Sequence, residues 1–438
     1  MVNATTSTEK AEMSTPSQTQ VMRLLGGAAL VGVVAGIAAS LMLWIIEQGT
    51  ELFYVHLPSV LGVVALPWWW AAGMLVIGAG LVALAKKLPG ATGPGPLSGF
   101  HFDLPLVVVP SVLAAALATL IFGMVLGPEA PLIVLGSAIG AILTRHADPQ
   151  TRKAMMLLGG VAAIGAVFGN PFVTAFMVLE FAAIGMVPAM LITPVLVALA
   201  SSYVVQIGIW GIPGFGVHSL SVPGLPSYSS IAAGDLGTAL VVSVVAGAIA
   251  ILARKGGLAF ERHSSTRAMR GLFIGAIVTA AVVCISMTIF DVAPQLILFS
   301  GSAGMSSLIE QTSIVSILVI LAGKAIAYAM ALGGGFRGGP IFPATFLGVA
   351  VAVLTVAILP SDSVSALAAA AIAASAAAMI KLPATSALLG MVLIVGAGPD
   401  VAPFAILGAV IGFGIRTFVD SKNESVKDRA IESEGLLA

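Results

Sequence analysis

Long apolar stretches separated by short polar ones dominate the sequence. The apolar runs lie at 21–46, 60–85, 104–126, 154–168, 171–206, 236–253, 272–290, 314–333, 341–359, 364–380, 384–398 and 401–419. Several are shorter than the roughly 20 residues that span a bilayer as a helix, and several are interrupted by Gly and Pro. No run alternates apolar and polar residues with a period of two, which argues against a membrane β-barrel. The pattern predicts an all-α polytopic membrane protein with tilted and broken helices.

The polar stretches indicate an orientation in the membrane. Basic residues gather in three short segments, at Lys86–Lys87, Arg145–Lys153 and Arg254–Arg270, which the positive-inside rule places in the cytoplasm. The segment 207–231 has no Lys or Arg and is predicted to be an external loop. Residues 1–20, rich in Ser, Thr and Gln, and residues 420–438 are predicted to be cytoplasmic tails, the first of them disordered. We expect a multi-pass protein of the plasma membrane.

Composition supports this class and excludes others. The chain has 438 residues, of which 59% are hydrophobic and 9% charged, whereas soluble domains carry about 25% charged residues. The net charge is zero, so no basic patch favours nucleic acid as a partner. Cys284 is the single cysteine, and the five histidines show no metal-ligand spacing, so no disulfide, metal or other cofactor is predicted.

The strongest pattern is an internal repeat. The segment beginning at Gly123 (GMVLGPEAPLIVLGSAIGAI) matches the segment beginning at Gly335 (GFRGGPIFPATFLGVAVAVL), and the same offset of 212 residues aligns Pro171 with Pro383. Two separated motifs in one register indicate a duplicated unit, near 21–206 and 232–419. Membrane transporters are often built from inverted repeats, with the binding site at the repeat interface. We therefore predict an inverted repeat.

In each repeat, a G-P-x-x-P motif at Gly127 or Gly339 precedes an apolar helix. Pro is suited to the first turn of a helix, and Gly allows another backbone or an ion to approach closely. A helix that starts in mid-membrane points free N–H groups and the positive end of its dipole at whatever lies there. Two such ends from opposite halves would form an anion site. The alternative is a pair of kinks that only improve packing.

Glu129 lies inside the first motif, where an acidic side chain is costly unless it faces water, a partner or an ion path. An ionised carboxylate at a positive helix end can occupy the anion's place, and a protonated one can leave it. This predicts that Glu129 is a gate, and its counterpart at the offset of 212 is Ile341. The alternative is a structural carboxylate that caps nearby N–H groups.

Other ionisable residues are rare in the apolar body. Glu180 is the one acidic residue of its run and is interpreted either as a proton or water station or as a structural acid bonded to backbone at a helix end. Lys324 and Arg337 flank the second motif, and pairing with a Glu is the favoured interpretation over attracting anions. The histidines, His101 among them, fall in predicted loops and are expected to be solvated.

These motifs together resemble a known family. The order GPGP at Gly93, GPEAP at Gly127, FGNP at Phe168 and GGPIFP at Gly338 is similar to the chloride channel (CLC) family of anion channels and proton-coupled anion exchangers. The resemblance covers about residues 21–419. It implies a homodimer with one pore in each subunit, each subunit being an inverted repeat.

The resemblance also implies roles for individual residues. The family's gating glutamate falls on Glu129, and its anion-binding segments fall on the residues listed next. They are Gly93, Pro94, Gly95 and Pro96; Gly127, Pro128 and Ala130; and Gly339, Pro340, Ile341 and Phe342. Pro94 replaces the family's anion-binding Ser, and Pro340 removes one backbone N–H. The internal proton glutamate matches Phe181, beside Glu180, and no Tyr follows Tyr328 to act as a pore tyrosine.

We therefore expect transmembrane transport of chloride or a similar small inorganic anion, with Glu129 as the gate, and no enzymatic activity. One alternative is a proton-coupled anion exchanger that uses Glu180. Another is a solute carrier of a different class that shares only the repeat architecture. A membrane hydrolase is disfavoured, because no His or Asp lies in a neighbouring membrane span to activate Ser302 in the segment GSAG.

Overall fold

The structure is a computed structural model that describes residues 18–63, 65–212, 221–229, 231–264, 268–361, 363–394 and 396–435. The described part is almost entirely helical, and its only β-type pairing is one isolated bridge. Nine of its helices are long and apolar enough to cross a bilayer, and five shorter apolar helices accompany them. This confirms the predicted all-α membrane protein with broken helices.

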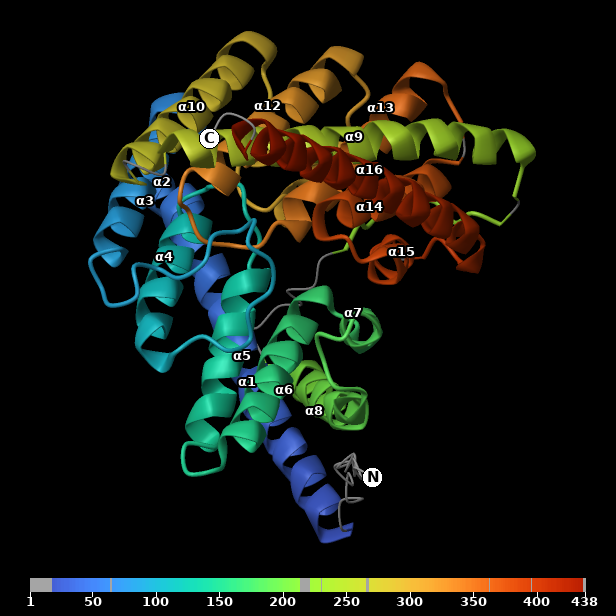
Figure 1. The fold of residues 1–438 in the computed structure, drawn as a ribbon. Coiled ribbons are helices and arrows are strands. Elements are labelled where there is room, and N and C mark those ends of the chain that lie inside the picture. Colours follow the sequence, from blue (N-terminus) through green and yellow to red (C-terminus); the bar gives the residue numbers. More distant parts are fainter. Residues whose placement is uncertain are drawn as a thin grey trace.

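The helices divide into two sets along the chain. In Figure 1 the blue-to-green set lies mostly below the yellow-green-to-red set, except for the blue helices labelled α2 and α3, which lie at the upper left beside α10. The first set comprises α1 (Gln18–Glu51), α2 (Leu57–Val60), α3 (Trp68–Ala85), α4 (Val109–Ile121), α5 (Glu129–Leu143), α6 (Pro149–Phe168), α7 (Pro171–Ala183) and α8 (Ile192–Trp210). The second comprises α9 (Ala233–Ser264), α10 (Ala268–Phe290), α11 (Met305–Ile309), α12 (Ile314–Gly333), α13 (Ile341–Ile358), α14 (Val364–Ile380), α15 (Pro383–Val392) and α16 (Ala402–Gly435).

The repeat at the offset of 212 residues is visible in the helix bounds of α5–α7 and α13–α15. Helices α5 and α13 begin at equivalent residues, Glu129 and Ile341, and α7 and α15 begin at the equivalent prolines. Helices α6 and α14 end at equivalent positions, and each is followed by a left-handed residue, Gly169 and Lys381. The packing repeats as well, because α5 packs on α6 and α6 on α7 in the first set, as α13 does on α14 and α14 on α15 in the second.

Close helix contacts depend on small residues at repeated positions. A Cβ placed on Gly136 of α5 would overlap the carbonyl of Gly159 in α6. The equivalent contact joins Gly348 of α13 to the carbonyl of Ala371 in α14. Small residues let helix backbones approach where lipid gives no hydrophobic driving force for association, so these contacts set the helix spacing in both repeats.

The repeats are inverted. Gly127 and Gly339, which are equivalent residues, form an antiparallel bridge in which each amide donates to the other's carbonyl, with N···O distances of 2.8 and 2.6 Å. Reciprocal bonds between equivalent residues require the two segments to run in opposite directions through a local two-fold axis. The N-termini of α5 and α13 therefore begin two residues beyond the bridge, on either side of this axis.

Some helix bounds differ from those of the apolar runs. The run 171–206 is divided into α7 and α8, because Gly185 takes a left-handed conformation and a short 3₁₀ turn follows at Ala189–Leu191. Helix α16 continues through Gly435, past the boundary expected at residue 419. Residues 1–17 of the predicted tail lie outside the described residues, as do residues 213–220 and 230 of the predicted loop. In the described part of that loop, the amides of Val222 and Tyr228 donate to carbonyls of Leu393 and Ala397.

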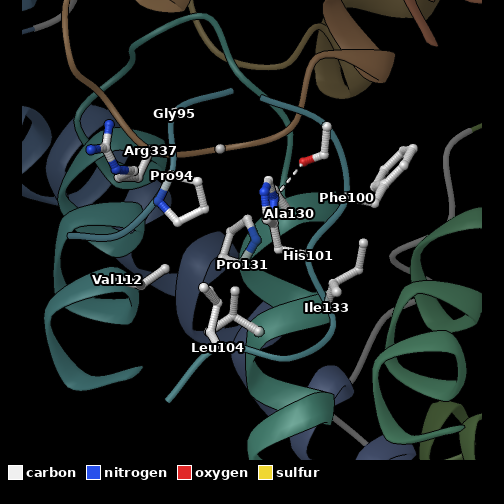
Figure 2. Close-up of a pocket in the computed structure, with 13 residues that line it drawn as sticks. Pro94, Gly95, Phe100, His101, Leu104, Val112, Ala130, Pro131, Ile133 and Arg337 are labelled. Carbon is white, nitrogen blue, oxygen red and sulfur yellow. Dashed lines mark hydrogen bonds between the residues drawn. The ribbon is translucent and has the colours of Figure 1, made fainter. Parts of the chain in front are cut away.

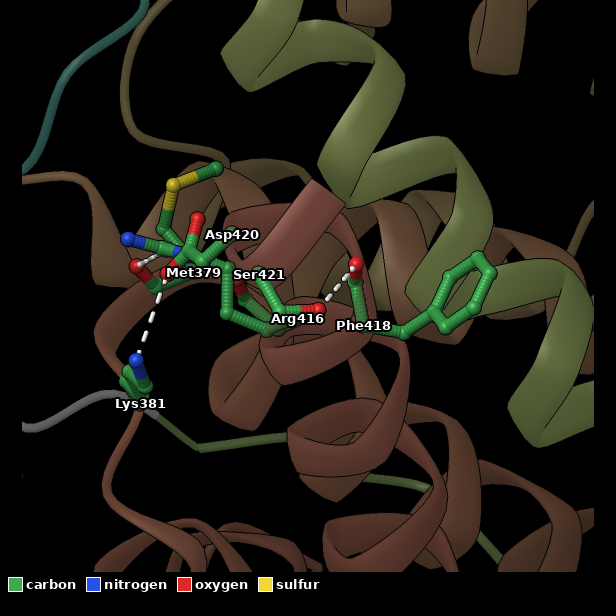
Figure 3. Close-up of polar contacts among 7 residues, drawn as sticks. Met379, Lys381, Arg416, Phe418, Asp420 and Ser421 are labelled. Atoms are coloured by element: carbon green, nitrogen blue, oxygen red, sulfur yellow. Dashed lines mark hydrogen bonds and ion pairs between the residues drawn. The ribbon is translucent and has the colours of Figure 1, made fainter. Parts of the chain in front are cut away.

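Polar side chains bond to the C-terminal carbonyls of α14 (Figure 3). The Arg416 guanidinium in α16 donates through Nη1 to the carbonyls of Ala378 and Met379, at 3.1 and 2.9 Å. Its Nε also donates to Asp420 at 2.9 Å, and Lys381 Nζ lies 3.4 Å from the same carboxylate. These bonds satisfy carbonyls that a helix end leaves without intrahelical partners.

Candidate functional site

Glu129 is the first residue of α5, and its carboxylate lies at the first turn of α13 in the other repeat. Oε1 accepts hydrogen bonds from the amides of Ile341 and Phe342, with N···O distances of 3.0 and 2.9 Å. The residue is fully buried, as are Ile341 and Phe342. These are amides that the first turn of a helix leaves unpaired. The carboxylate thus accepts hydrogen bonds from the free N–H groups at the positive end of α13.

The second oxygen of the carboxylate is unpaired. Glu129 Oε2 is buried and has no hydrogen-bond partner among the described residues. It lies against the Gly127–Gly339 bridge, where a Cβ on either glycine would overlap the carboxylate. A buried carboxylate oxygen without a donor is costly. Gly127 and Gly339 therefore leave the space that the carboxylate fills. Only the two hydrogen bonds to Oε1 keep the carboxylate there.

Prolines stand at both helix starts. Pro128 and Pro340 are the N-cap residues of α5 and α13, and neither has an N–H to offer. The Tyr328 hydroxyl in α12 donates to the carbonyl of Pro340, and Tyr328 is fully buried. The sequence analysis assigned Tyr328 no role in the site. Its position in an apolar helix just before the second motif was the available signal.

Arg337 joins the Gly93–Pro96 loop of the first repeat to the second motif. Its Nε donates to Thr92 O at 2.7 Å and Nη2 to Gly93 O at 2.9 Å, while Nη1 donates to the carbonyls of Gly335 and Phe336 at 3.1 and 2.9 Å. Thr92 and Gly93 have positive φ values of 73° and 64°, which turn their carbonyls to the guanidinium. The expected pairing with a Glu is not a direct ion pair in the described part, because Arg337 serves four backbone carbonyls and Glu261 acts on it only through its charge at longer range.

A small cavity of about 30 Å³ lies between the three predicted segments (Figure 2). Pro94 and Gly95 line it from the first loop, Ala130 and Pro131 from the start of α5, and Gly338 from the second motif. The structure thus brings the predicted segments together around one space. Pro96 is buried nearby, and Phe342 packs against Phe168 with ring centroids 6.1 Å apart.

His101 also lines this cavity. Its Nδ1 lies 3.1 Å from the carbonyl of Gly99, and the side chain is partly buried. The residues on either side, Phe100 and Phe102, pack against Phe181 with centroid separations of 5.7 and 6.3 Å. His101 is therefore only partly the solvated loop histidine that the sequence predicts, because the stacking of its neighbours brings the loop onto α7.

Glu180 lies at the end of α7 and contacts the start of α15. Oε1 accepts from Ala384 N at 2.8 Å, and Oε2 accepts from Thr385 N at 2.8 Å and from the Thr385 hydroxyl. Both oxygens are thus engaged by the first turn of a helix in the other repeat. This geometry is that of the structural alternative, a carboxylate bonded to backbone at a helix end, and a part in proton transfer stays a prediction.

Lys324 is fully buried in α12 and contacts no carboxylate in the described part of the chain. Nζ donates to the carbonyls of Leu298 and Phe299 at 2.8 and 3.3 Å, and it lies 4.3 Å from the ring centroid of Phe346. The expectation that Lys324 pairs with a Glu is therefore wrong. The bent backbone at Phe299, with φ of 61°, presents carbonyls in its place.

No group of three or more His, Cys, Asp or Glu residues that could hold a metal ion occurs among the described residues. The arrangement in the described part is instead one of helix N-termini, backbone N–H groups and a single carboxylate. Such groups suit a small anion, because positive helix ends and unpaired amides favour negative charge.

Comparisons with known proteins relate the chain to a family. A family model described as "Voltage gated chloride channel" matches residues 93–417. YfeO of Escherichia coli (strain SMS-3-5 / SECEC), which is named as an ion-transport protein, is 26% identical over 342 residues, covering 74% of this chain and 78% of that protein. YfeO of Escherichia coli (strain K12 / DH10B) is 27% identical over 342 residues with the same coverage.

Solved structures share the fold. A slow cyanobacterial Cl⁻/H⁺ antiporter superposes with a TM-score of 0.75 at 17% identity, covering 91% of this chain and 95% of that one. A CLC-type fluoride/proton antiporter superposes with a TM-score of 0.72 at 18% identity, covering 92% and 97%. Because these sequence identities are low, the structural likeness establishes the shared fold alone.

Proposed function

The chain belongs to the voltage-gated chloride channel family, and we propose that it carries chloride or a similar small inorganic anion across the plasma membrane through a pore gated by Glu129. One observation carries the proposal. The Glu129 carboxylate accepts hydrogen bonds from the amides of Ile341 and Phe342. These amides are the donors that an anion at the N-terminus of α13 would use.

The gate works by competition for these donors. An ionised Glu129 carboxylate and a transported anion carry the same charge and cannot both occupy the end of α13. Protonation removes the charge and weakens the two hydrogen bonds, because bonds to a charged acceptor are roughly twice as strong as neutral ones. The unpaired Oε2 leaves the carboxylate held from one side only. Acidification should therefore open the pore.

Backbone groups provide the rest of the pathway. Gly127 and Gly339 lie against the carboxylate, and Pro94 and Gly95 line the cavity at the start of α5. None of these residues carries a full positive charge. An anion held by helix ends and amides is bound weakly enough to leave, as conduction requires. A carrier for a cation would need facing oxygen ligands, whereas the residue equivalent to Glu129 is Ile341.

The fold relatives support proton-coupled exchange as a second candidate. The two solved structures described above are antiporters that couple chloride or fluoride to protons. In this chain, Glu180 is the acid beside the position that would serve protons, and its oxygens are engaged by Ala384 and Thr385. We propose a homodimer with one pore in each subunit for either mode.

Flux from vesicles tests the proposal. Purified protein in liposomes loaded with chloride should release it when a potassium ionophore balances the charge, and protein-free vesicles should not. Substitution with nitrate and fluoride gives the selectivity. Vesicles that leak none of the three anions would rule the function out. A chloride gradient that drives protons against their own gradient identifies an exchanger. If chloride moves without driving protons, the protein is a channel.

A further inference from the structure

Three basic side chains gather around the C-terminal end of α14. Arg254 belongs to α9, Lys381 directly follows α14, and Arg416 lies in α16. The α9 residues one turn before Arg254 form a small apolar core with Ala378 of α14 and with α16. This packing brings Arg254 to the same place as the other two cations. We refer to Arg254, Lys381 and Arg416 as the Arg254 cluster.

The cluster carries more positive charge than the described part of the chain neutralises. Arg416 Nε and Lys381 Nζ share one carboxylate, that of Asp420, at 2.9 and 3.4 Å (Figure 3). The charges of Arg416 and Asp420 act on Arg254, but Arg254 makes no hydrogen bond or ion pair with any described residue. Glu180 has both oxygens engaged by donors of α15. Three cations therefore face one carboxylate.

The cluster lies where the helices reach the end of their apolar parts. Helix α9 has 32 residues, whereas roughly 20 cross a bilayer. It carries no charged side chain over residues 236–253, so its apolar part ends at Arg254 and Lys255. Helix α16 is likewise uncharged from its start to Ile415. Both helices thus leave the hydrocarbon region at the cluster, on the side that the basic segments predict to be cytoplasmic.

Exposed apolar side chains lead from the bilayer to the cluster. On α9, Val241, Val245 and Leu252 are exposed, and their spacing places them on one helix face with the exposed Lys255. On α16, Phe418 is 70% exposed and points away from the polar contacts (Figure 3). A ligand with an apolar part and a negatively charged head matches this combination of surfaces.

We propose that the Arg254 cluster binds the phosphate of an anionic membrane lipid in the cytoplasmic leaflet, with the acyl chains against the exposed apolar side chains of α9 and α16. A guanidinium suits a phosphate, because its planar N–H donors pair with two oxygens at once. Arg254 offers such a group, and Arg416 retains Nη2, which donates to no described residue. Basic pockets between membrane helices on the cytoplasmic side bind lipid headgroups in this way.

The charge of the cluster also selects among lipids. Phosphatidylcholine carries its own cation beside the phosphate, so it brings no net negative charge to the three basic side chains. Phosphatidylglycerol carries one net negative charge and no cation. The inference is independent of the proposed transport function, because lipid binding requires only the folded chain.

Lipid-dependent melting tests the proposal. Phosphatidylglycerol added to the purified full chain in detergent should raise the melting temperature until the site is saturated, because a ligand of the folded state stabilises it. Phosphatidylcholine with the same acyl chains should not. Arg254→Gln should weaken the apparent Kd for phosphatidylglycerol about fivefold, which corresponds to about 1 kcal/mol for one basic residue near an anionic headgroup. Arg254→Lys keeps the charge and should retain most of the affinity.

Arg270→Gln is the matched control, since Arg270 is an exposed arginine of α10 in a segment also predicted to be cytoplasmic. It should keep the wild-type Kd. The proposal is overturned if both lipids act alike, if Arg254→Gln keeps the wild-type Kd, or if Arg270→Gln weakens binding as much as Arg254→Gln.

Inorganic phosphate distinguishes a lipid headgroup from a soluble ligand of the same chemistry. At the same concentrations it should leave the melting temperature unchanged, because it lacks the acyl chains that α9 and α16 contact. A rise as large as that with phosphatidylglycerol would assign the cluster to a soluble phosphate and overturn the lipid proposal. None of these measurements depends on anion flux, so vesicles that carry no anion would refute the transport function alone.

Discussion

Gly127 and Gly339 exchange two backbone hydrogen bonds across 212 residues of sequence, at N···O distances of 2.8 and 2.6 Å. The bridge places the axis of the inverted repeat between them and brings the starts of α5 and α13 to the same point. A side chain on either glycine would occupy the space of the Glu129 carboxylate. Duplication thus creates both the meeting of two helix ends and the room for one acid between them.

The first prediction concerns the gate. Glu129→Ala frees the amides of Ile341 and Phe342, so chloride flux at about pH 7 should rise on the order of a hundredfold and lose its dependence on pH, as expected for two lost charge-assisted hydrogen bonds. Glu129→Gln keeps the side-chain volume and cannot ionise, so its flux should be equally independent of pH but lower.

Glu310→Gln is a suitable control for Glu129, because Glu310 is exposed after α11. Liposome efflux measured from about pH 5 to 8 gives the comparison. If Glu129→Ala keeps the wild-type profile, the carboxylate only caps α13 and the gating role fails.

The second prediction concerns Glu180. Both carboxylate oxygens accept from donors of α15, so in Glu180→Gln the new amide NH₂ faces a donor and one bond is lost. The melting temperature should fall, consistent with about 1–3 kcal/mol for a hydrogen bond to a charged group, while anion flux persists. Thr385→Val removes the hydroxyl donor alone and should give a smaller fall.

Proton coupling tests the other role of Glu180. If a chloride gradient drives protons in the wild type and the coupling disappears in Glu180→Gln while Thr385→Val retains it, Glu180 transfers protons. Unchanged stability in Glu180→Gln would show that the bonds to α15 contribute little.

The internal repeat is the sequence feature that predicted the fold. The offset of 212 residues identifies equivalent helix starts at Glu129 and Ile341, because Gly and Pro restrict where a helix can begin. That Glu129 bonds to the amide of its own counterpart was beyond sequence reasoning. A repeat gives the order of the helices, whereas the meeting of their ends depends on packing throughout both halves.

The partners of the buried charged residues were beyond sequence reasoning for a different reason. Arg337 and Lys324 bond to backbone carbonyls, which every residue has, so no pattern of residue types marks the acceptor. The turns that present these carbonyls have positive φ at Thr92 and Phe299, where glycine would be expected. Likewise, the partners of Glu180 are amides more than 200 positions away along the chain.

The third prediction is a pH dependence of stability at the α5–α6 loop. The Asp148 side chain caps α6, with Oδ1 accepting from the amides of Gln150 and Thr151 at 3.0 Å each. Hydrogen bonds from Thr151 hold the pKa of Asp148 below its usual value. A carboxyl whose folded pKa is lowered stabilises the fold above its unfolded pKa of about 4, and this contribution is lost as the pH falls through the folded pKa.

Asp148→Ala should therefore lower the melting temperature in detergent at about pH 7, and the difference from wild type should shrink below about pH 4. Asp148→Asn keeps an acceptor for the two amides and should retain most of the wild-type stability without this pH dependence. Parallel melting curves for wild type and Asp148→Ala across the range would contradict the assignment.

The last prediction tests the small-residue contacts that repeat in both halves. Gly136→Ala forces a methyl group into the carbonyl of Gly159, and Gly348→Ala forces one into the carbonyl of Ala371. Because backbone atoms line both contacts, neither can be relieved by rotating a side chain. Overpacking a close interior contact costs about 1–3 kcal/mol, so each variant should melt at a lower temperature than wild type. Gly80→Ala in α3 is the matched control, since nothing lies within 4 Å of its Cβ and alanine favours a helix by about 1 kcal/mol over glycine. That variant should melt at or above the wild-type temperature. If Gly136→Ala is as stable as Gly80→Ala, the spacing of α5 and α6 does not depend on the missing side chain at Gly136.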